Sequence, residues 1–145
     1  MLRGNYPATV DGKGRLKIPA AFLAELSEMG NEFYVTSENG DRAVIYPMKE
    51  WNRIEERLAQ VPSHNEAKRK FLTRTNYYGQ VVTLDKQGRL LIPAVLRESA
   101  QMQGQVDVLG YQKHLEVWNH ARFQDHLTNS QITADDAKAL DELGI

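Results

Sequence analysis

The stretch Asp11-Gly-Lys-Gly-Arg-Leu-Lys-Ile-Pro-Ala20 decides the fold of this chain, because it occurs twice. It returns as Asp85-Lys-Gln-Gly-Arg-Leu-Leu-Ile-Pro-Ala94, with seven of the ten positions identical. The similarity extends further along the chain, where Val44-Ile45-Tyr46 aligns with Glu116-Val117-Trp118. Identity of this density is improbable by chance. The sequence therefore predicts two copies of one structural unit.

Each copy has the pattern of a β-hairpin followed by a helix. Residues 6–10 and 81–84 alternate as strands do, and the Asp-x-x-Gly-Arg segments that follow favour tight turns, since glycine tolerates positive φ. Pro19 and Pro93 then predict helix starts. Two more strands (33–36 with 42–46, and 106–109 with 114–118) and a helix complete each unit. The fold class expected is α+β and rich in β-structure.

The repeat divides the chain into four parts. The first unit is expected at residues 1–60 and the second at 77–128, joined by a linker helix within 61–76. Ser63 and Glu66 match a capping box for that helix. Residues 129–145 form an acidic tail, in which Thr133 and Asp136 could cap a last short helix.

Composition restricts the class of protein. The chain has 145 residues, 41% hydrophobic and 26% charged, with a net charge of −1 and no cysteine. These values are typical of a soluble globular protein. Without cysteine, disulfides, thiolate zinc sites and cysteine nucleophiles are excluded. We expect a cytoplasmic protein with no membrane partner, because the N-terminus lacks a signal-like apolar region and no apolar run could span a bilayer.

Basic residues gather around the repeated turns although the net charge is nearly zero. Near the first turn they are Arg3, Lys13, Arg15 and Lys17, and near the second they are Lys86 and Arg89. Local basic patches of this kind can bind phosphate. The larger group predicts that the first turn is the stronger anion site.

Two interpretations of the repeated Asp–Arg pair stay open at this point. In one, Arg15 and Arg89 contact phosphate or guanine on DNA, while Asp11, Gly14, Asp85 and Gly88 brace the turns. In the other, each Asp and Arg form an ion pair that only fixes the turn.

Other candidate sites carry weaker signals. The run Lys68-Arg69-Lys70 with Arg74 is typical of a solvated helix face. The four histidines lack metal-ligand spacing, so no metal is expected. Trp51, Trp118 and Phe123 are expected in the core. The chain has no catalytic or nucleotide-binding motif, and we therefore expect no catalytic residue, cofactor or small-molecule substrate.

The opening Met1-Leu-Arg-Gly4, the two Asp-x-x-Gly-Arg-Leu-x-Ile-Pro segments, Ile45-Tyr46-Pro47 and Glu116-Val117-Trp118 resemble the MraZ family over about residues 1–127. The resemblance implies two tandem AbrB/SpoVT-type, swapped-hairpin-like β-barrel units. It also implies a cytoplasmic, nucleoid-associated protein that assembles into closed homo-oligomeric rings.

The function that the resemblance implies is binding of double-stranded DNA, usually as a repressor, at repeated sites in the promoter of the cell-division and cell-wall gene cluster. The family's Asp-x-x-x-Arg motif falls on Asp11/Arg15 and Asp85/Arg89. Gln87 stands where the first copy has Lys13, which makes DNA contact by the second turn the weaker expectation. The alternatives are an AbrB-like antitoxin or interaction protein and a structural ring scaffold; an enzyme ranks last.

Overall fold

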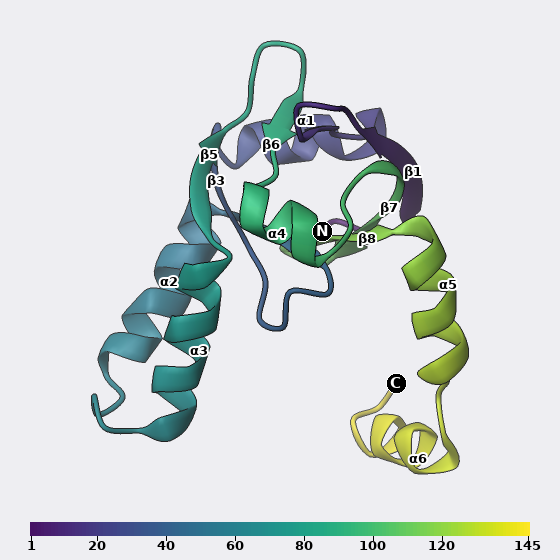
Figure 1. The fold of residues 1–145 in the computed structure, drawn as a ribbon. Helices are drawn as coiled ribbons and strands as arrows, with labels where there is room; N and C mark the ends of the chain where they lie inside the picture. The colour runs from purple at the N-terminus through teal and green to yellow at the C-terminus, as the bar shows by residue number, and fades with distance from the viewer.

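The computed structural model describes all 145 residues and contains eight strands and six helices (Figure 1). The strands are β1 (Asn5–Val10), β2 (Arg15–Lys17), β3 (Glu32–Thr36), β4 (Ala43–Pro47), β5 (Gln80–Thr83), β6 (Arg89–Leu91), β7 (Gly104–Tyr111) and β8 (His114–Asn119). The helices are α1 (Ala20–Glu28), α2 (Met48–Ala59), α3 (Glu66–Tyr77), α4 (Ala94–Ser99), α5 (His120–Asn129) and α6 (Ala134–Glu142).

All eight strands belong to one antiparallel sheet in the order β5-β3-β4-β8-β7-β1-β2-β6. Its two outermost strands, β5 and β6, also contact each other, so the sheet is nearly closed into a barrel. The predicted α+β, β-rich class is confirmed.

The two repeats exchange strands within this sheet. The first strand of repeat one, β1, pairs with β7 of repeat two, and β5 of repeat two pairs with β3 of repeat one. The equivalent strands of the two repeats are β1 and β5, β2 and β6, β3 and β7, and β4 and β8. If each strand is replaced by its equivalent, the series from β5 to β1 reads in the reverse order, and β2 and β6 exchange places. The fold therefore has an internal two-fold arrangement with the swapped character expected of its class. The residue limits of the two units stay a prediction.

The core lies inside the barrel and comes from both repeats. Leu16 of β2 lies opposite Leu90 of β6, and both side chains are fully buried. Ile18 and Ile92, two residues further on, are buried as well, because residues spaced by two point to the same face of an extended chain. Trp51, Trp118 and Phe123 are also buried, as expected.

Helix boundaries differ from the sequence prediction in detail. Pro19 and Pro93 are N-cap residues with extended backbone, so the helices begin one residue later. The linker helix α3 is capped by Asn65, whose side chain accepts from the Lys68 N–H, and not by Ser63. The capping box of Thr133 and Asp136 on α6 is confirmed. None of the six helices is both long and apolar enough to cross a bilayer.

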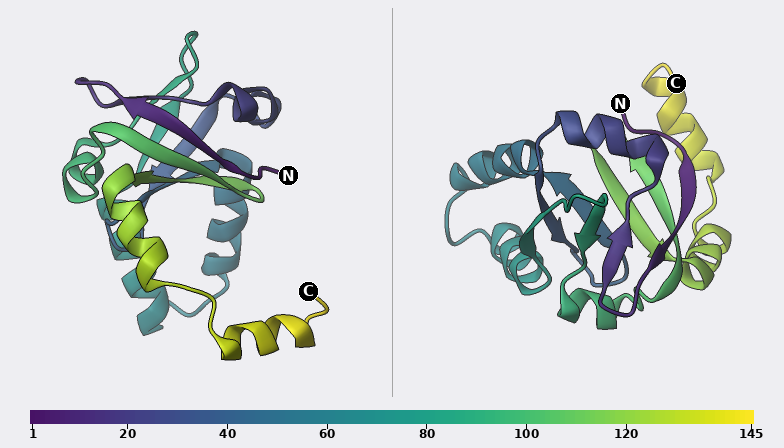
Figure 2. Two further views of the ribbon diagram at one scale, coloured as in Figure 1. Left: turned by 90° about the vertical axis from the view of Figure 1, so that its right-hand side faces the viewer. Right: turned by 90° about the horizontal axis from the view of Figure 1, so that it is seen from above.

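The barrel has two different ends (Figures 1 and 2). The two Asp-x-x-Gly-Arg turns project from one end. The pair α2 and α3 extends from the other end on one side, and α5 with α6 extends on the opposite side. The basic turns are thus separated from the acidic tail by the full depth of the barrel.

Candidate nucleic-acid interface

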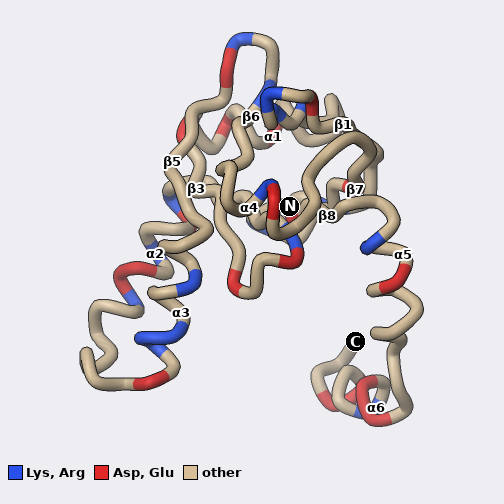
Figure 3. The backbone as a smooth tube through the Cα atoms, in the orientation of Figure 1, with Lys and Arg blue, Asp and Glu red and all other residues tan.

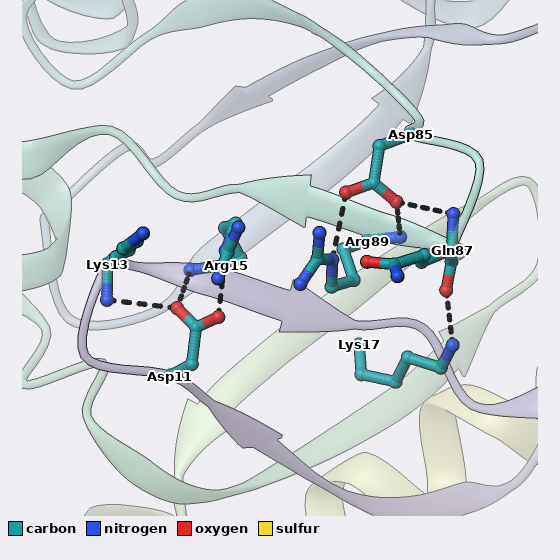
Figure 4. Close-up of polar contacts among 7 residues, drawn as sticks. All are labelled: Asp11, Lys13, Arg15, Lys17, Asp85, Gln87 and Arg89. Atoms are coloured by element: carbon teal, nitrogen blue, oxygen red, sulfur yellow. Dashed lines mark hydrogen bonds and ion pairs between the residues drawn. The ribbon is translucent and has the colours of Figure 1, made fainter.

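The first turn is organised by the side chain of Asp11 (Figure 4). Its Oδ1 accepts the backbone N–H of Lys13 at 3.0 Å and of Arg15 at 2.9 Å. Its Oδ2 accepts the Nε–H of Arg15 at 2.8 Å. Gly14 closes the turn with φ of +83°, a conformation that favours glycine. A single carboxylate therefore fixes both the backbone of the turn and the direction of the arginine.

The second turn repeats this geometry. Asp85 accepts the backbone N–H groups of Gln87 and Arg89 and the Arg89 Nε–H, all at 2.9 Å, and Gly88 has φ of +74°. Neither Arg15 nor Arg89 uses its Nη atoms in a hydrogen bond within the chain. The edge of each guanidinium that binds phosphate or guanine in bidentate fashion is therefore free.

Both turn carboxylates are charged at neutral pH. Hydrogen bonds from the backbone N–H of Arg15, then from its side chain and the Lys13 N–H, hold the pKa of Asp11 below its ordinary value of 3.8 against a smaller effect of burial. The backbone N–H of Arg89 is the largest cause of the same lowering of the pKa of Asp85. The Asp–Arg pairs lie at the surface, since about a third of each side chain is exposed. Each Asp–Arg pair therefore fixes its turn and still leaves the arginine accessible to a ligand.

Pairing of β2 with β6 brings the two turns into one surface. Lys17 lies opposite Arg89 and Arg15 lies opposite Leu91, while Leu16 and Leu90 between them point into the core. Arg15, Lys17, Arg89 and Leu91 therefore share the outer face of a two-stranded antiparallel ribbon. The turns flank this ribbon at its two ends (Figure 4).

The position of Lys17 corrects the grouping made from the sequence. Its Nζ donates to the backbone carbonyl of Gln87, in the second turn, and lies close to Gly88. Lys17 follows the first turn in the chain, but the strand that carries it runs away from that turn toward the other one. It belongs to the second turn with Lys86 and Arg89.

Arg97 of α4 joins the first turn, and the sequence analysis missed it. Its guanidinium lies directly over Gly14, so that a methyl group added at Gly14 would collide with it. The equivalent residue of the first repeat is Leu23, which covers Gly88 in the same way. Each helix therefore covers the turn of the other repeat. No local signal in the sequence reveals this, because it depends on the exchange between repeats.

Arg3 is not part of this surface. It lies before the far end of β1, where Leu2 bridges to Gln112 and the Arg3 backbone contacts Gly110. The whole length of β1 separates it from Asp11. The structure thus brings together Lys13, Arg15 and Arg97 at one turn and Lys17, Lys86 and Arg89 at the other. Each turn thus has three cations, as the contacts of Arg97 and Lys17 show. Figure 3 shows basic positions along both turns.

Two other groups of charged side chains pair within the fold. Arg42 pairs with Asp41 at 3.2 Å and Glu116 at 3.3 Å and lies over the ring of Trp118, and His120 contacts the buried Asp107 at 2.7 Å. No group of three or more metal-ligating side chains is present. The braced arginines at the turns are therefore the strongest candidate site of the molecule.

Comparison with known proteins shows the family to which the chain belongs. The family model described as "MraZ protein, putative antitoxin-like" matches residues 1–74 and 79–143. A protein from Acidobacterium capsulatum named transcriptional regulator MraZ is 51% identical over 146 residues, covering all of both chains. Proteins of the same name from Koribacter versatilis and Thermoanaerobacter pseudethanolicus are 47% and 37% identical, also over their full lengths. The chain belongs to the MraZ family.

Proposed function

We propose that this chain is a DNA-binding transcriptional regulator and has no catalytic role. Relatives that match it over their full length are named transcriptional regulators. The observation that carries the proposal is the outer face of the β2–β6 ribbon, with a braced arginine from each repeat and two further cations at each turn.

The ribbon has the form and chemistry for the major groove of DNA. That groove admits a two-stranded β-ribbon, and arginine pairs with the O6 and N7 atoms of guanine through two N–H groups. Arg15 and Arg89 have these groups free, and their aspartates hold them in place before DNA arrives. Lys13, Lys17, Lys86 and Arg97 around them supply phosphate contacts. Arg3, at the other end of β1, is left out of this interface.

We further propose that the protein acts as a repressor at repeated sites in the promoter of the cell-division and cell-wall gene cluster, where it is associated with the nucleoid. Repeated sites suit a closed homo-oligomeric ring, because a ring presents the same ribbon several times. Each further contact is then made at high effective concentration, so weak single contacts add up to tight binding.

A salt titration on the DNA upstream of the chain's own gene tests the proposal. The wild-type chain should bind this DNA more tightly than a shuffled fragment of the same length. The logarithm of its affinity should fall linearly with the logarithm of salt concentration, with a slope of about −0.9 for each phosphate contacted. The matched variant Arg3→Ala should bind like wild type, whereas Arg15→Ala with Arg89→Ala should bind weakly.

Equal affinity for both fragments would contradict sequence-specific regulation. Absence of any DNA binding by a correctly assembled oligomer would instead favour the structural scaffold.

A further inference from the structure

The acidic C-terminal helix α6 has no partner within its own chain. It stands clear of the barrel in Figure 1 and in the left view of Figure 2. No ion pair links it to another element, and its hydrogen bonds stay within the tail. An isolated helix of 9 residues is marginal in water, since even helices of about 12–15 residues are.

The ends of α6 are nevertheless defined in detail. Thr133 and Asp136 form a capping box at its start. At its end Gly144 adopts φ of +80° and donates to the Asp141 carbonyl, while the Ile145 N–H donates to the Leu140 carbonyl. This pattern is a Schellman motif. The local sequence therefore specifies a helix that the rest of the chain does not stabilise by packing.

The tail also exposes its apolar side chains. Ile132, Leu143 and Ile145 are 72%, 74% and 79% exposed. Beside them stand four carboxylates, Asp135, Asp136, Asp141 and Glu142, against the single cation Lys138. The surface that fits such a segment has apolar positions flanked by lysine or arginine.

Helix α3 offers that surface. A groove of about 270 Å³ along it is lined by Ala67, Phe71, Lys70 and Arg74 together with Glu38 and Asn39. The ring of Phe71 stacks on the ring of Trp51, and the Phe71 side chain is still partly exposed to solvent. The Arg74 Nε–H donates to the Glu38 carbonyl, which holds this guanidinium at the edge of the groove. None of the four basic side chains of α3 forms an ion pair with a carboxylate of the chain.

Two placements argue for a second copy of the chain as the occupant. Helices α3 and α6 lie on opposite sides of the molecule below the barrel, so the tail does not cover its own groove (Figure 1). Helix α3, which lines this groove, also extends from the end of the barrel away from the basic turns (Figure 2), where DNA bound to the ribbon would not reach it. The positive charge of α3 is therefore free for a protein partner.

We propose that α6 of one copy docks in the α3 groove of the next, with Leu140, Leu143 and Ile145 over Ala67 and Phe71, and with Asp141 and Glu142 facing Lys70 and Arg74. Because the donor and acceptor surfaces differ, the contact is head-to-tail and can close into a ring. The inference rests on the ring assembly of the proposed function and names the contact that holds the ring together.

Charge reversal tests the contact in the full-length chain. Lys70→Glu with Arg74→Glu, or Asp141→Lys with Glu142→Lys, should each weaken self-association by about tenfold or more, because like charges then face each other. All four changes in one chain should restore the mass measured by light scattering. Arg57→Glu on α2 and Asp125→Lys on α5 are the matched controls and should keep the wild-type mass. An unchanged mass for both reversal variants, or no restoration, would overturn the proposal.

Cross-linking identifies the occupant, and the absence of native cysteine removes any background. A chain carrying Ala67→Cys, mixed with a tagged chain carrying Leu143→Cys and treated with a short bismaleimide, should give a covalent heterodimer. A single chain that carries both changes is the reference: if it cross-links only within itself and the mixed chains give no heterodimer, the tail covers its own groove and the assignment to a second copy is wrong. DNA affinity is measured separately, so failure of docking and failure of DNA binding are distinguishable.

Discussion

The aspartate, glycine and arginine of each turn determine the geometry of the candidate site, and the sequence pattern predicted the role of each in the turn. The Asp-x-x-Gly-Arg spacing predicted a tight turn with a glycine at positive φ and an aspartate bracing an arginine, and the structure contains both turns. The cover provided by Arg97 and Leu23 could not be predicted, because it depends on how distant segments pack. The hydrogen bonds within a turn follow from the residues of the turn itself, whereas the residues that pack over the turn come from distant parts of the chain.

Gly14 and Gly12 lie in the same turn and should respond differently to alanine. Gly14 has φ of +83° with Arg97 above it, whereas Gly12 has ordinary φ and no atom within 4 Å of an added Cβ. Gly14→Ala should lower the free energy of unfolding by about 1–2 kcal/mol, the cost of the left-handed conformation, and should weaken DNA binding by displacing Arg97. Gly12→Ala should leave both within error. Thermal melting and DNA titration of the two variants check this, and equal effects would contradict the assigned turn geometry.

The lowered pKa of both turn aspartates predicts how stability changes in acid. A carboxyl group with a pKa below 3.8 in the folded chain stabilises the fold above that pH, and this contribution is lost as pH falls through the lower, folded value. Melting temperatures should therefore carry the full contribution from neutral pH down to about 4. In the variant with Asp11→Asn and Asp85→Asn the acid decline should be shallower. A decline parallel to that of wild type would show that other carboxylates cause it.

At the scale of elements, the order of strands and helices followed the sequence pattern, and the errors have physical causes. Pro19 and Pro93 were expected as the first helical residues, but their extended ψ near 140° makes them caps. Strand β2 runs from the first turn toward the second, so Lys17 lies at the second turn, although it is closer in sequence to the first.

The corrected position of Lys17 changes the expected ranking of the two arginines. The sequence predicted that the first turn is the stronger anion site, which would make Arg15→Ala cost more DNA affinity than Arg89→Ala. With three cations at each turn, we now expect losses of about tenfold each, within about threefold of one another. Each variant should also reduce the salt slope by about one. Titrations at several salt concentrations measure both quantities.

Melting curves of Arg15→Ala and Arg89→Ala distinguish direct DNA contact by the arginines from a purely structural role of the Asp–Arg pairs. The Arg15 and Arg89 side chains are 33% and 26% exposed, and ion pairs at the surface contribute little, so their removal should hardly change the melting temperature. A clear loss of stability together with the loss of DNA affinity would identify the pairs as structural braces alone.

At the scale of the whole molecule, the sequence revealed two repeats but not how they share a sheet. Pairing of β1 with β7 and of β3 with β5 joins residues about 100 and 50 positions apart, and such choices depend on packing of the complete barrel. The exchange has a functional consequence. It places β2 beside β6, so one copy presents both arginines on one ribbon, and the proposed ring would present several such ribbons.

A ring that engages several repeats at once should be sensitive to the helical phase of the DNA. Repeats separated by whole turns, about 10–10.5 base pairs each, face the same side of the duplex. Inserting about 5 base pairs between two upstream repeats turns one of them to the far side, where a second ribbon of the ring cannot reach it. Affinity should fall toward that for a single repeat, and inserting about 10 base pairs should restore much of it. Titrations on the three fragments at one salt concentration measure this, with a single-repeat fragment as the reference. If every spacing bound alike, the copies would be acting independently on DNA, and the ring would contribute nothing to recognition of repeated sites.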